Sequence, residues 1–420
     1  MRILVVSNIE LDDTNAAGNT FANWLTGWLD TEVSSLYCRT ALPHNDFCDS
    51  FYRISSISVV KNIITPWKIG EYIKKRDIRL QSAERIEGQI INKIKRGGLS
   101  FLQVLNDIVI SSRIWQNRRY KDYIHSFDPD IVFYFAKSEA FIYQNLKFLK
   151  RHTKAKFVAF FADDMYSMYQ GRGFKNWIFR QRYPKLIKMS DKNYGASLLM
   201  CDTYSKQFGI TLSPLYKGCN ISSSKNQCNE PIRIVYAGNL FYGRDKTLGK
   251  IIEVLQRINS EKQLAFVEIY TNAVITDENK VALNVEGTSK IMGSRRFADI
   301  QEILKEADIV LHVESFEPQN IKIVRLSYST KISDCLESGS MMLVVGPSGI
   351  ASVEEAKCID GVVVIDKEDL IEKNIRSVIA DPNSIVNRAK QTNVVAKALF
   401  PIEVIRKKLH NDFVKLINEK

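Results

Sequence analysis

The chain alternates between short apolar runs and longer amphipathic stretches. Phe21, Trp24, Leu25 and Trp28, for example, have helical spacing directly after the first run and its polar loop. The apolar runs are rich in β-branched and aromatic residues and lie at 2–7, 130–135, 156–161, 232–238, 264–270, 308–313, 341–346 and 361–365. Such runs, separated by helical patterns, predict buried parallel strands with crossover helices. We therefore expect an α/β protein built from doubly wound sheets.

The alternation is interrupted at residues 213–231, where Pro, Gly, Asn and Ser dominate. This composition is typical of a linker, and 420 residues are enough for two domains with separate cores. We predict one Rossmann-like domain at 1–212, a linker at 213–231 and a second Rossmann-like domain at 232–400. The amphipathic segment at 401–420 predicts a final helix.

Composition narrows the classes of protein. A hydrophobic content of 45% and a charged content of 25% are ordinary for a globular protein, whereas the net charge of +12 favours an anionic partner. The seven cysteines are scattered and odd in number, which argues against a disulfide framework or a zinc site and favours a reducing compartment. The first apolar run is shorter than a signal peptide, and no window approaches the roughly 20 apolar residues of a membrane span. The expected location is the cytoplasm, with any membrane contact peripheral, at the inner face of the cytoplasmic membrane.

Most of the positive charge comes from residues 53–121, which hold 15 Lys and Arg residues against 5 Asp and Glu residues. Within them, residues 69–94 mix Lys74, Lys75 and Arg76 with many isoleucines. This mixture predicts a basic amphipathic helix. Such a helix can lie on an anionic membrane, or it can be a solvated helix whose apolar stripe packs on the core.

The candidate site lies at residues 325–339, between two of the apolar runs. Ser329 and Thr330 are good N-cap residues, and the free N–H groups of a helix start bind phosphate. Lys331 adds a cation, and Asp334 offers a carboxylate one turn later that can hold two vicinal hydroxyls. This order suits a nucleoside diphosphate, although a plain capped helix with a solvated Lys–Asp pair has the same residues.

The run Ser-Thr-Lys-Ile-x-Asp-x-Leu-x-x-Gly at 329–339 resembles the donor-site signature of GT-B glycosyltransferases of the GT4-like kind. It is similar, more narrowly, to enzymes that build bacterial capsular or O-antigen polysaccharides. The resemblance implies that Lys331 approaches the donor diphosphate and that Asp334 binds the ribose. Many such enzymes carry a Glu where this chain has Leu326. Glu314 and Glu317 are the nearest candidates to replace its hydrogen bond to the donor sugar.

A second landmark of the family is a Gly-x-Leu turn with a cation six residues after the Gly, and it is matched by Gly238 and Arg244. The resemblance implies that the Arg244 guanidinium forms a bidentate contact with the diphosphate. Asn239 stands where the family often has another cation, so Arg325 or Lys331 would supply that charge. The alternative for Arg244 is an ordinary surface arginine.

The first half of the chain contributes four further candidates. By the same resemblance, the loop with Gly18 and Asn19 would lie across a cleft from the donor, although a need for positive φ explains Gly18 equally well. Asp163 and Asp164 follow an apolar run, where paired carboxylates can bind a metal or act as a base. The resemblance argues against a metal, and we expect an acceptor-side or loop-structuring role.

The resemblance implies two Rossmann-like domains facing across a cleft, with the final helix crossing back to the first domain. It implies a retaining, metal-independent glycosyltransferase without a cofactor. The enzyme would move a sugar from a nucleotide-diphosphate sugar to a lipid-linked polysaccharide precursor, with Arg244 and Lys331 stabilising the leaving diphosphate.

Two alternatives to this function stay open. One is a nucleotide-dependent dehydrogenase, disfavoured because the chain lacks G-x-G-x-x-G at its Rossmann-like opening. The other is a non-catalytic basic scaffold of GT-B shape that binds membrane or nucleic acid. No RNP-like, zinc or helix-turn-helix signature accompanies the positive charge, so nucleic acid is not an expected partner.

Overall fold

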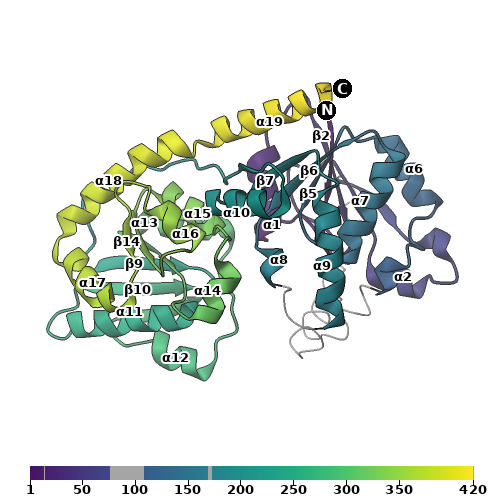
Figure 1. Cartoon of the computed structure of the whole chain (residues 1–420). Helices are drawn as coiled ribbons and strands as arrows, with labels where there is room; N and C mark the ends of the chain where they lie inside the picture. The colour runs from purple at the N-terminus through teal and green to yellow at the C-terminus, as the bar shows by residue number, and fades with distance from the viewer. Residues whose placement is uncertain (14, 76–107, 169–172, 420) are drawn as a thin grey trace. The chain divides into compact units, whose positions relative to one another are not determined.

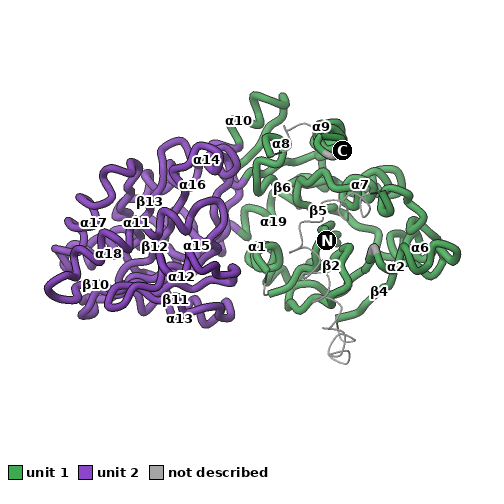
Figure 2. The backbone as a smooth tube through the Cα atoms, turned by 90° about the horizontal axis from the view of Figure 1, so that it is seen from below, with its two compact units in different colours: residues 1–195, 201–213, 406–420 green, residues 196–200, 214–405 purple. Residues whose placement is uncertain are grey.

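The computed structural model describes residues 1–13, 15–75, 108–168 and 173–419. The chain forms two compact units, which are coloured separately in Figure 2. Unit 1 comprises Met1–Gly195, Cys201–Ser213 and Arg406–Lys420, and unit 2 comprises Ala196–Met200 and Pro214–Ile405. Each unit is organised around one sheet, and the two units are described in turn.

The sheet of unit 1 has the strand order β4-β3-β2-β1-β5-β6-β7-β8. Strand β1 pairs in parallel with both β2 and β5, so the winding direction reverses at β1, as in doubly wound folds. The bounds are β1 Arg2–Val6, β2 Glu32–Tyr37, β3 Ser50–Arg53, β4 Glu71–Lys74, β5 Ile131–Phe135, β6 Lys156–Phe161, β7 Lys192–Gly195 and β8 Ser213–Pro214.

Helices cover both faces of this sheet (Figure 1). On one face, the Phe133 ring of β5 lies 5.0 Å from Phe21 of α1 and 5.4 Å from Phe413 of α19. On the other face, Tyr123 of α6 stacks on Tyr52 at 4.5 Å and shares a 2.7 Å hydrogen bond with Ser34. The helices that lie wholly or mostly in unit 1 are α1 Ala16–Leu25, α2 Ser56–Lys61, η1 Pro66–Lys68, α6 Arg118–Phe127, α7 Ala140–His152, α8 Met165–Met168, α9 Phe174–Ile187, α10 Leu198–Phe208 and α19 Ile402–Asn418.

The predicted basic helix at 69–94 is wrong where it can be compared with the structure. Residues 71–74 form strand β4, which pairs antiparallel with β3. The edge of β3 offers free backbone groups, and a 2.6 Å ion pair between Arg53 and Glu71 fixes the register. Residues 76–94 lie outside the described residues.

The sheet of unit 2 has the order β11-β10-β9-β12-β13-β14, and all its pairings are parallel. This is the strand order of a Rossmann fold, with the reversal between β9 and β12. The bounds are β9 Ile232–Ala237, β10 Ala265–Tyr270, β11 Ser289–Gly293, β12 Ile309–Val313, β13 Met341–Val345 and β14 Val363–Ile365. The prediction of two doubly wound Rossmann-like sheets is confirmed.

Helices α11 and α12 lie on one face of the second sheet, and α13 and α15 lie on the other (Figure 1). The apolar stripe of α11, at Leu248, Ile251 and Leu255, is buried against the strands, as its helical spacing predicts. The helices of unit 2 are α11 Arg244–Ile258, α12 Asp277–Leu283, α13 Phe297–Glu306, α14 Pro318–Val324, α15 Thr330–Ser338, α16 Ala351–Ala356, η2 Glu368–Leu370, α17 Ile371–Ala380 and α18 Pro382–Leu399.

The segment with linker-like composition is partly buried in unit 2. Lys217 and Cys219 are buried, and the Ser222 N–H donates to the carbonyl of Glu337 at the end of α15. Cys219 also forms an isolated parallel bridge with Pro401. This stretch is therefore part of the packing around α15.

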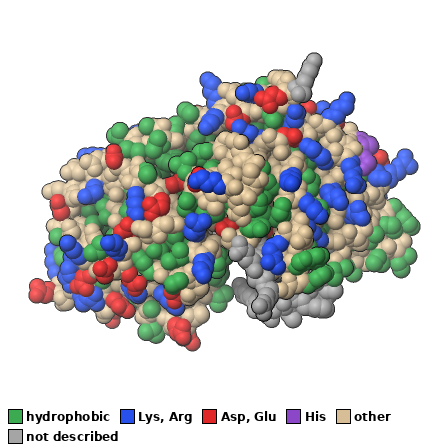
Figure 3. All heavy atoms as spheres, in the orientation of Figure 1, with side chains coloured by type: hydrophobic (Ala, Val, Ile, Leu, Met, Phe, Trp, Pro, Cys, Tyr) green, Lys and Arg blue, Asp and Glu red, His purple; other side chains and the backbone are tan. Residues whose placement is uncertain are grey.

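Surface charge, the lack of a membrane-spanning helix among the described residues and the state of the cysteines bear on function. On the face shown in Figure 3, Lys and Arg side chains are spread over unit 1 with few acidic neighbours, whereas both charges mix over unit 2. Within the described ranges, no helix is both long enough and apolar enough to cross a membrane. All seven cysteines are free thiols.

Candidate functional site

The strand order of unit 2 places a candidate site at the carboxyl ends of β9 and β12. Ligands of open α/β sheets bind where the winding reverses, because the loops after the two central strands diverge there. Gly238 and Asn239 follow β9, and Glu314 follows β12. Arg244 begins α11 and Lys331 lies in the first turn of α15. Five of the predicted donor-site residues thus come from segments that meet at this edge.

Arg244 is held in a buried ionic network. Its Nε and Nη2 donate to the two carboxylate oxygens of Glu314, at 3.1 and 2.9 Å. Nη1 donates to Asn239 Oδ1 at 2.9 Å, and His312 Nε2 lies 3.2 Å from Glu314. The side chains of Arg244 and Glu314 are only 11% and 2% exposed. The prediction named Arg244 and Glu314 separately as donor contacts, whereas the structure joins them as a bidentate pair.

The network controls the charges of its members. Burial raises the pKa of Glu314, but His312 and Arg244 outweigh burial and leave that pKa below its usual value. Burial lowers the pKa of Arg244, yet Glu314 reverses the effect and leaves it raised. Both groups are therefore charged at neutral pH.

Lys331 lies next to this network. An added Cβ at Gly238 would lie 3.3 Å from Lys331 Nζ and 2.7 Å from Tyr236 Oη, so the ammonium approaches the bare backbone of the turn. Burial, followed by repulsion from Arg244, lowers the pKa of Lys331. In the part of the chain that the structure describes, Lys331 Nζ has no hydrogen bond and no ion pair. The site therefore contains a partly buried ammonium for which the described residues supply no partner.

The β9 turn is shaped to admit this lysine. Tyr236 Oη donates to the carbonyl of Asn239 at 2.5 Å, and the Gly238 N–H donates to Tyr270 O at 2.9 Å. Both bonds pin the backbone of the turn. A side chain at position 238 would collide with Tyr236, so glycine is required there for steric reasons.

Asp334, the predicted ribose ligand, forms an ion pair with Lys217. Both side chains are largely buried, and the Lys217 ammonium also lies 4.9 Å from the centre of the Phe297 ring. The Ser333 hydroxyl donates to the Lys217 carbonyl at 3.1 Å, which ties the segment before β9 to α15. Sequence reasoning missed Lys217, because it lies 117 positions from its partner in a stretch of linker-like composition.

The remaining candidates of unit 2 are less closely connected. Ser329 is the N-cap residue of α15, but its side chain makes no capping hydrogen bond; its N–H donates to Ser352 Oγ at 3.0 Å. Thr330 begins the helix. Arg325 is exposed at the end of α14, and among the described residues no hydrogen bond or ion pair joins its side chain to Arg244 or Lys331. Glu317 is engaged by exposed Lys246 at 2.5 Å.

The candidates of unit 1 have structural explanations. Gly18 lies in the first turn of α1 with negative φ, so the alternative explanation by a need for positive φ is wrong. An added Cβ would lie 2.0 Å from the carbonyl oxygen of Asp12. Asn19 continues the helix with its N–H bonded to Asn15 O. Asp164 is buried and accepts from the Ser167 N–H and the Tyr204 hydroxyl. Asp163 is exposed beside it.

The site suits an anion better than a metal ion. Within the described ranges, no three His, Cys, Asp or Glu side chains are grouped so that they could hold a metal. The edge instead presents the Lys331 ammonium, the start of α15 and a carboxylate at Asp334. This set is chemically suited to a phosphate group next to a polyol.

Comparison with known proteins supports the fold. No protein-family model and no curated protein sequence matches the chain. Sucrose-phosphate synthase from Thermosynechococcus elongatus is similar in structure, with a TM-score of 0.62, 10% identity and coverage of 100% of both chains. HepE of Anabaena in complex with UDP has a TM-score of 0.63 and 11% identity, and the match covers 99% of this chain and 100% of that one.

A third solved structure, a glycosyltransferase from Rickettsia africae, has a TM-score of 0.61 and 12% identity, with coverage of 100% of this chain and 99% of that chain. Likeness at these identities establishes the fold. The predicted GT-B fold with two Rossmann-like domains is thereby confirmed.

Proposed function

We propose that the protein is a glycosyltransferase that takes its sugar from a nucleotide-diphosphate donor bound to unit 2. The observation that carries this proposal is the ammonium of Lys331, which is partly buried at the switch point of a Rossmann sheet and has no partner among the described residues. Burying an unpaired charge is unfavourable, and a bound phosphate would supply the missing negative charge. The similar HepE structure contains UDP, which supports this choice of ligand.

Each group of the site would have a distinct task. Lys331 and the free amides at the start of α15 would contact the diphosphate and stabilise the charge that develops as it leaves. Asp334 Oδ1 is held by Lys217, which leaves Oδ2 for a ribose hydroxyl. The guanidinium of Arg244 is hydrogen-bonded to Glu314. It would add positive potential to the site and hold the β9 turn in place through its hydrogen bond to Asn239.

The finer parts of the proposal rest on the resemblance in sequence. We infer transfer to a lipid-linked polysaccharide precursor of the capsular or O-antigen type, with retention of configuration and without a metal or other cofactor. Unit 1 would receive the acceptor. A retaining enzyme of this kind needs no protein nucleophile, and the phosphate-binding cations would take the place of a metal.

A peripheral contact with an anionic membrane is part of the proposal, and exposed apolar side chains support it. Around α2 and η1, Ile63, Ile64 and Trp67 are 65%, 85% and 58% exposed, next to Lys61 and Lys68. Apolar side chains beside lysines are typical of surfaces that enter the headgroup region. Replacing Ile64 and Trp67 with Ser should weaken binding to vesicles that contain anionic lipid; unchanged binding would contradict this contact.

The donor site can be tested by ligand binding. UDP, GDP, ADP and NAD are compared by thermal shift, and a nucleoside diphosphate at 100 times its Kd should stabilise the protein by about 2.7 kcal/mol. Lys331→Met removes a charge-assisted contact worth about 1.5–3 kcal/mol, so affinity should fall at least about tenfold. Lys322→Met is the matched control, because Lys322 is an exposed lysine of the same unit.

The outcomes separate the candidate functions. If Lys331→Met and Asp334→Asn bind the nucleotide as the wild type does, the site is wrong. Stabilisation by NAD alone would favour the dehydrogenase, and binding of only RNA or anionic vesicles would favour the scaffold. Once the nucleotide is known, release of the nucleoside diphosphate from a panel of its sugars identifies the donor.

A further inference from the structure

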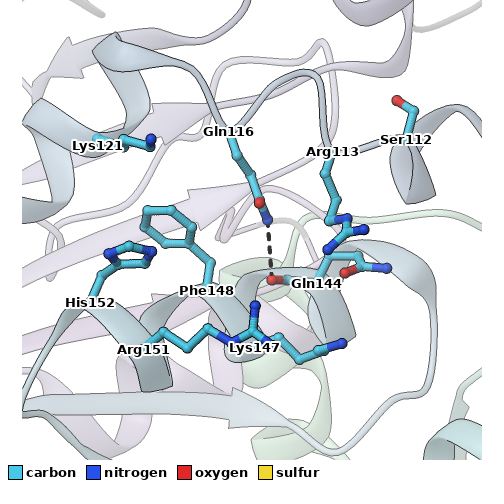
Figure 4. Close-up of a pocket in the computed structure, with 9 residues that line it drawn as sticks. All are labelled: Ser112, Arg113, Gln116, Lys121, Gln144, Lys147, Phe148, Arg151 and His152. Carbon is cyan, nitrogen blue, oxygen red and sulfur yellow. Dashed lines mark hydrogen bonds between the residues drawn. The ribbon is translucent and has the colours of Figure 1, made fainter.

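A second candidate site lies in unit 1, on the outer side of helices α6 and α7. It is a surface pocket of about 380 Å³, within the range of roughly 300–1,000 Å³ that is typical of ligand sites. Figure 4 shows the side chains around it. The lining residues are Ser112, Arg113, Gln116, Lys121, Gln144, Lys147, Phe148, Arg151 and His152.

One wall of the pocket is a single stripe of α7. Counted from Gln144, the residues Lys147, Phe148, Arg151 and His152 lie three, four, seven and eight positions further on, which places all five on one face of the helix. The stripe is polar and basic except for Phe148, whose ring stacks on His152 with 4.1 Å between centroids. The stack presents the imidazole at the pocket and limits its rotation.

The opposite wall comes from the segment before α6 and from α6 itself. Arg113 and Gln116 precede the helix, and Lys121 lies in its first turn. Basic residues in the last turn of α7 are favoured by the helix dipole. That effect does not account for Lys121, because the first turn of α6 is a helix N-terminus, where the dipole favours negative charge. The two walls therefore bring cations together from independent elements.

The cations of the pocket have no acidic partner in the part of the chain that the structure describes. No carboxylate is among its lining residues. Within the described part of the chain, Arg113, Lys121, Lys147 and Arg151 form no ion pair, whereas neighbouring cations outside the pocket do. Those neighbours pair as Lys150 with Asp191 at 3.2 Å and Arg118 with Asp122 at 3.7 Å. Four cations around one cavity repel each other and concentrate positive potential in it.

The pocket also has neutral hydrogen-bonding groups. The Gln116 amide donates to the Gln144 backbone carbonyl at 3.3 Å, which holds the two walls together (Figure 4). The side-chain oxygen of Gln144 is buried without a hydrogen-bond partner in the described structure. An unpartnered amide of this kind gains a hydrogen bond if it turns toward a ligand, to which it can present either an acceptor or a donor.

We propose that this pocket binds a phosphate group, as a phosphomonoester or a pyrophosphate, and that it is separate from the nucleotide site of unit 2. Phosphate fits because two guanidinium groups and two ammonium groups can surround its oxygens with charge-assisted hydrogen bonds. The group can belong to a soluble metabolite or to a lipid headgroup. The proposal does not depend on the function proposed above, because no residue is common to the two sites.

Histidine NMR tests the proposal at the site itself. The chain has five histidines, so their ring C–H signals can be assigned, with His152→Gln identifying the signal of His152. The full-length Lys331→Met variant, in which the unit 2 site is weakened, is titrated with inorganic pyrophosphate. We expect a saturable shift of the His152 signal, while the signal of His312, beside the unit 2 site, stays in place. Charge-assisted contacts predict that Lys147→Glu or Arg151→Glu weakens binding at least about tenfold.

Lys154→Glu is the matched control, because it makes the same charge change at an exposed residue two positions beyond α7 and outside the pocket. The proposal is overturned if pyrophosphate and phosphatidic acid vesicles both leave the His152 signal unchanged. It is also overturned if Lys154→Glu weakens binding as much as Arg151→Glu, since the attraction would then be diffuse.

A second experiment distinguishes a lipid headgroup from a soluble ligand as the source of the phosphate. Phosphatidylcholine vesicles with and without phosphatidic acid are compared in a sedimentation assay. Binding to phosphatidic acid that Arg151→Glu weakens and pyrophosphate displaces supports a lipid headgroup. A response to pyrophosphate without vesicle binding supports a soluble ligand. Vesicle binding that is insensitive to Arg151→Glu counts against the pocket as the headgroup site.

Discussion

Removing Glu314 should destabilise unit 2 strongly, because it leaves a buried guanidinium without its counter-ion. The Arg244 side chain is 11% exposed, and Glu314 accepts two of its hydrogen bonds. Breaking a buried ion pair by removing one partner costs about 3–5 kcal/mol. For a unit of this size each kcal/mol lowers Tm by about 2–4 °C. Glu314→Ala should therefore lower the transition of unit 2 by roughly 6–20 °C.

The assay must report on unit 2 separately. All five tryptophans lie in unit 1, so their fluorescence follows that unit, whereas calorimetry and far-UV circular dichroism follow both. Lys246→Ala is the control, because it breaks the exposed pair with Glu317, and exposed pairs contribute little. Its transition should stay close to that of the wild type.

A double variant tests the reasoning most directly. Arg244→Met combined with Glu314→Ala removes both charges, and an apolar replacement of a buried pair is often close to neutral. The double variant should be more stable than either single variant. If the loss from Glu314→Ala is below about 1 kcal/mol, or if the two single losses simply add, the network does not depend on charge compensation.

Three further predictions follow from groups described by the structure. Because the pKa of Lys331 is lowered, the protein's affinity for a nucleotide should fall as pH rises through that pKa, and nucleotide binding near that pH should take up protons. Calorimetry in buffers of different ionisation enthalpy should show the proton uptake, and Lys331→Met should lack it. Burial raises the pKa of Glu355 to about 7, although Leu198 N–H donates to it at 2.8 Å. Between pH 4.5 and 7 Glu355 is protonated in the folded state and ionised in the unfolded state, so the free energy of unfolding should fall as pH rises, by up to about 3 kcal/mol. Glu355→Gln should flatten this pH dependence, as measured by urea unfolding. Phe413→Ala should destabilise unit 1 by about 3–5 kcal/mol, followed by tryptophan fluorescence, whereas Val414→Ala on the exposed side should have little effect.

The sequence predicted the central strands well and the sheet edges poorly, for a physical reason. Strands β5 and β13 are continuous apolar runs, because both of their faces are covered. Strand β4 is a polar segment with one buried residue out of four, and it becomes a strand only by pairing with β3. Its local pattern carries no sign of that partner, so the same residues were predicted as a helix.

In the candidate site, too, the features set by neighbouring residues were predictable from the sequence, whereas the contacts between residues far apart in the chain were not. The start of α15 at Thr330 and its end before Gly339 follow from local signals, since Gly339 has the positive φ of a helix terminus. The pairing of Arg244 with Glu314 and of Lys217 with Asp334 joins residues 70 and 117 positions apart. Such contacts depend on the strand order, which the spacing of residues along the chain does not encode.

The packing of α19 has a consequence for biosynthesis. Phe413 contacts both Trp28 and Phe133, and Tyr194 Oη bonds Asp412 at 2.6 Å, so the hydrophobic centre of unit 1 is closed by a helix that is translated after unit 2. While the ribosome makes residues 214–405, one face of the first sheet lacks this cover. Until residues 406–420 are made, this aromatic surface stays exposed to water, and exposed apolar surface makes a folding intermediate prone to aggregate.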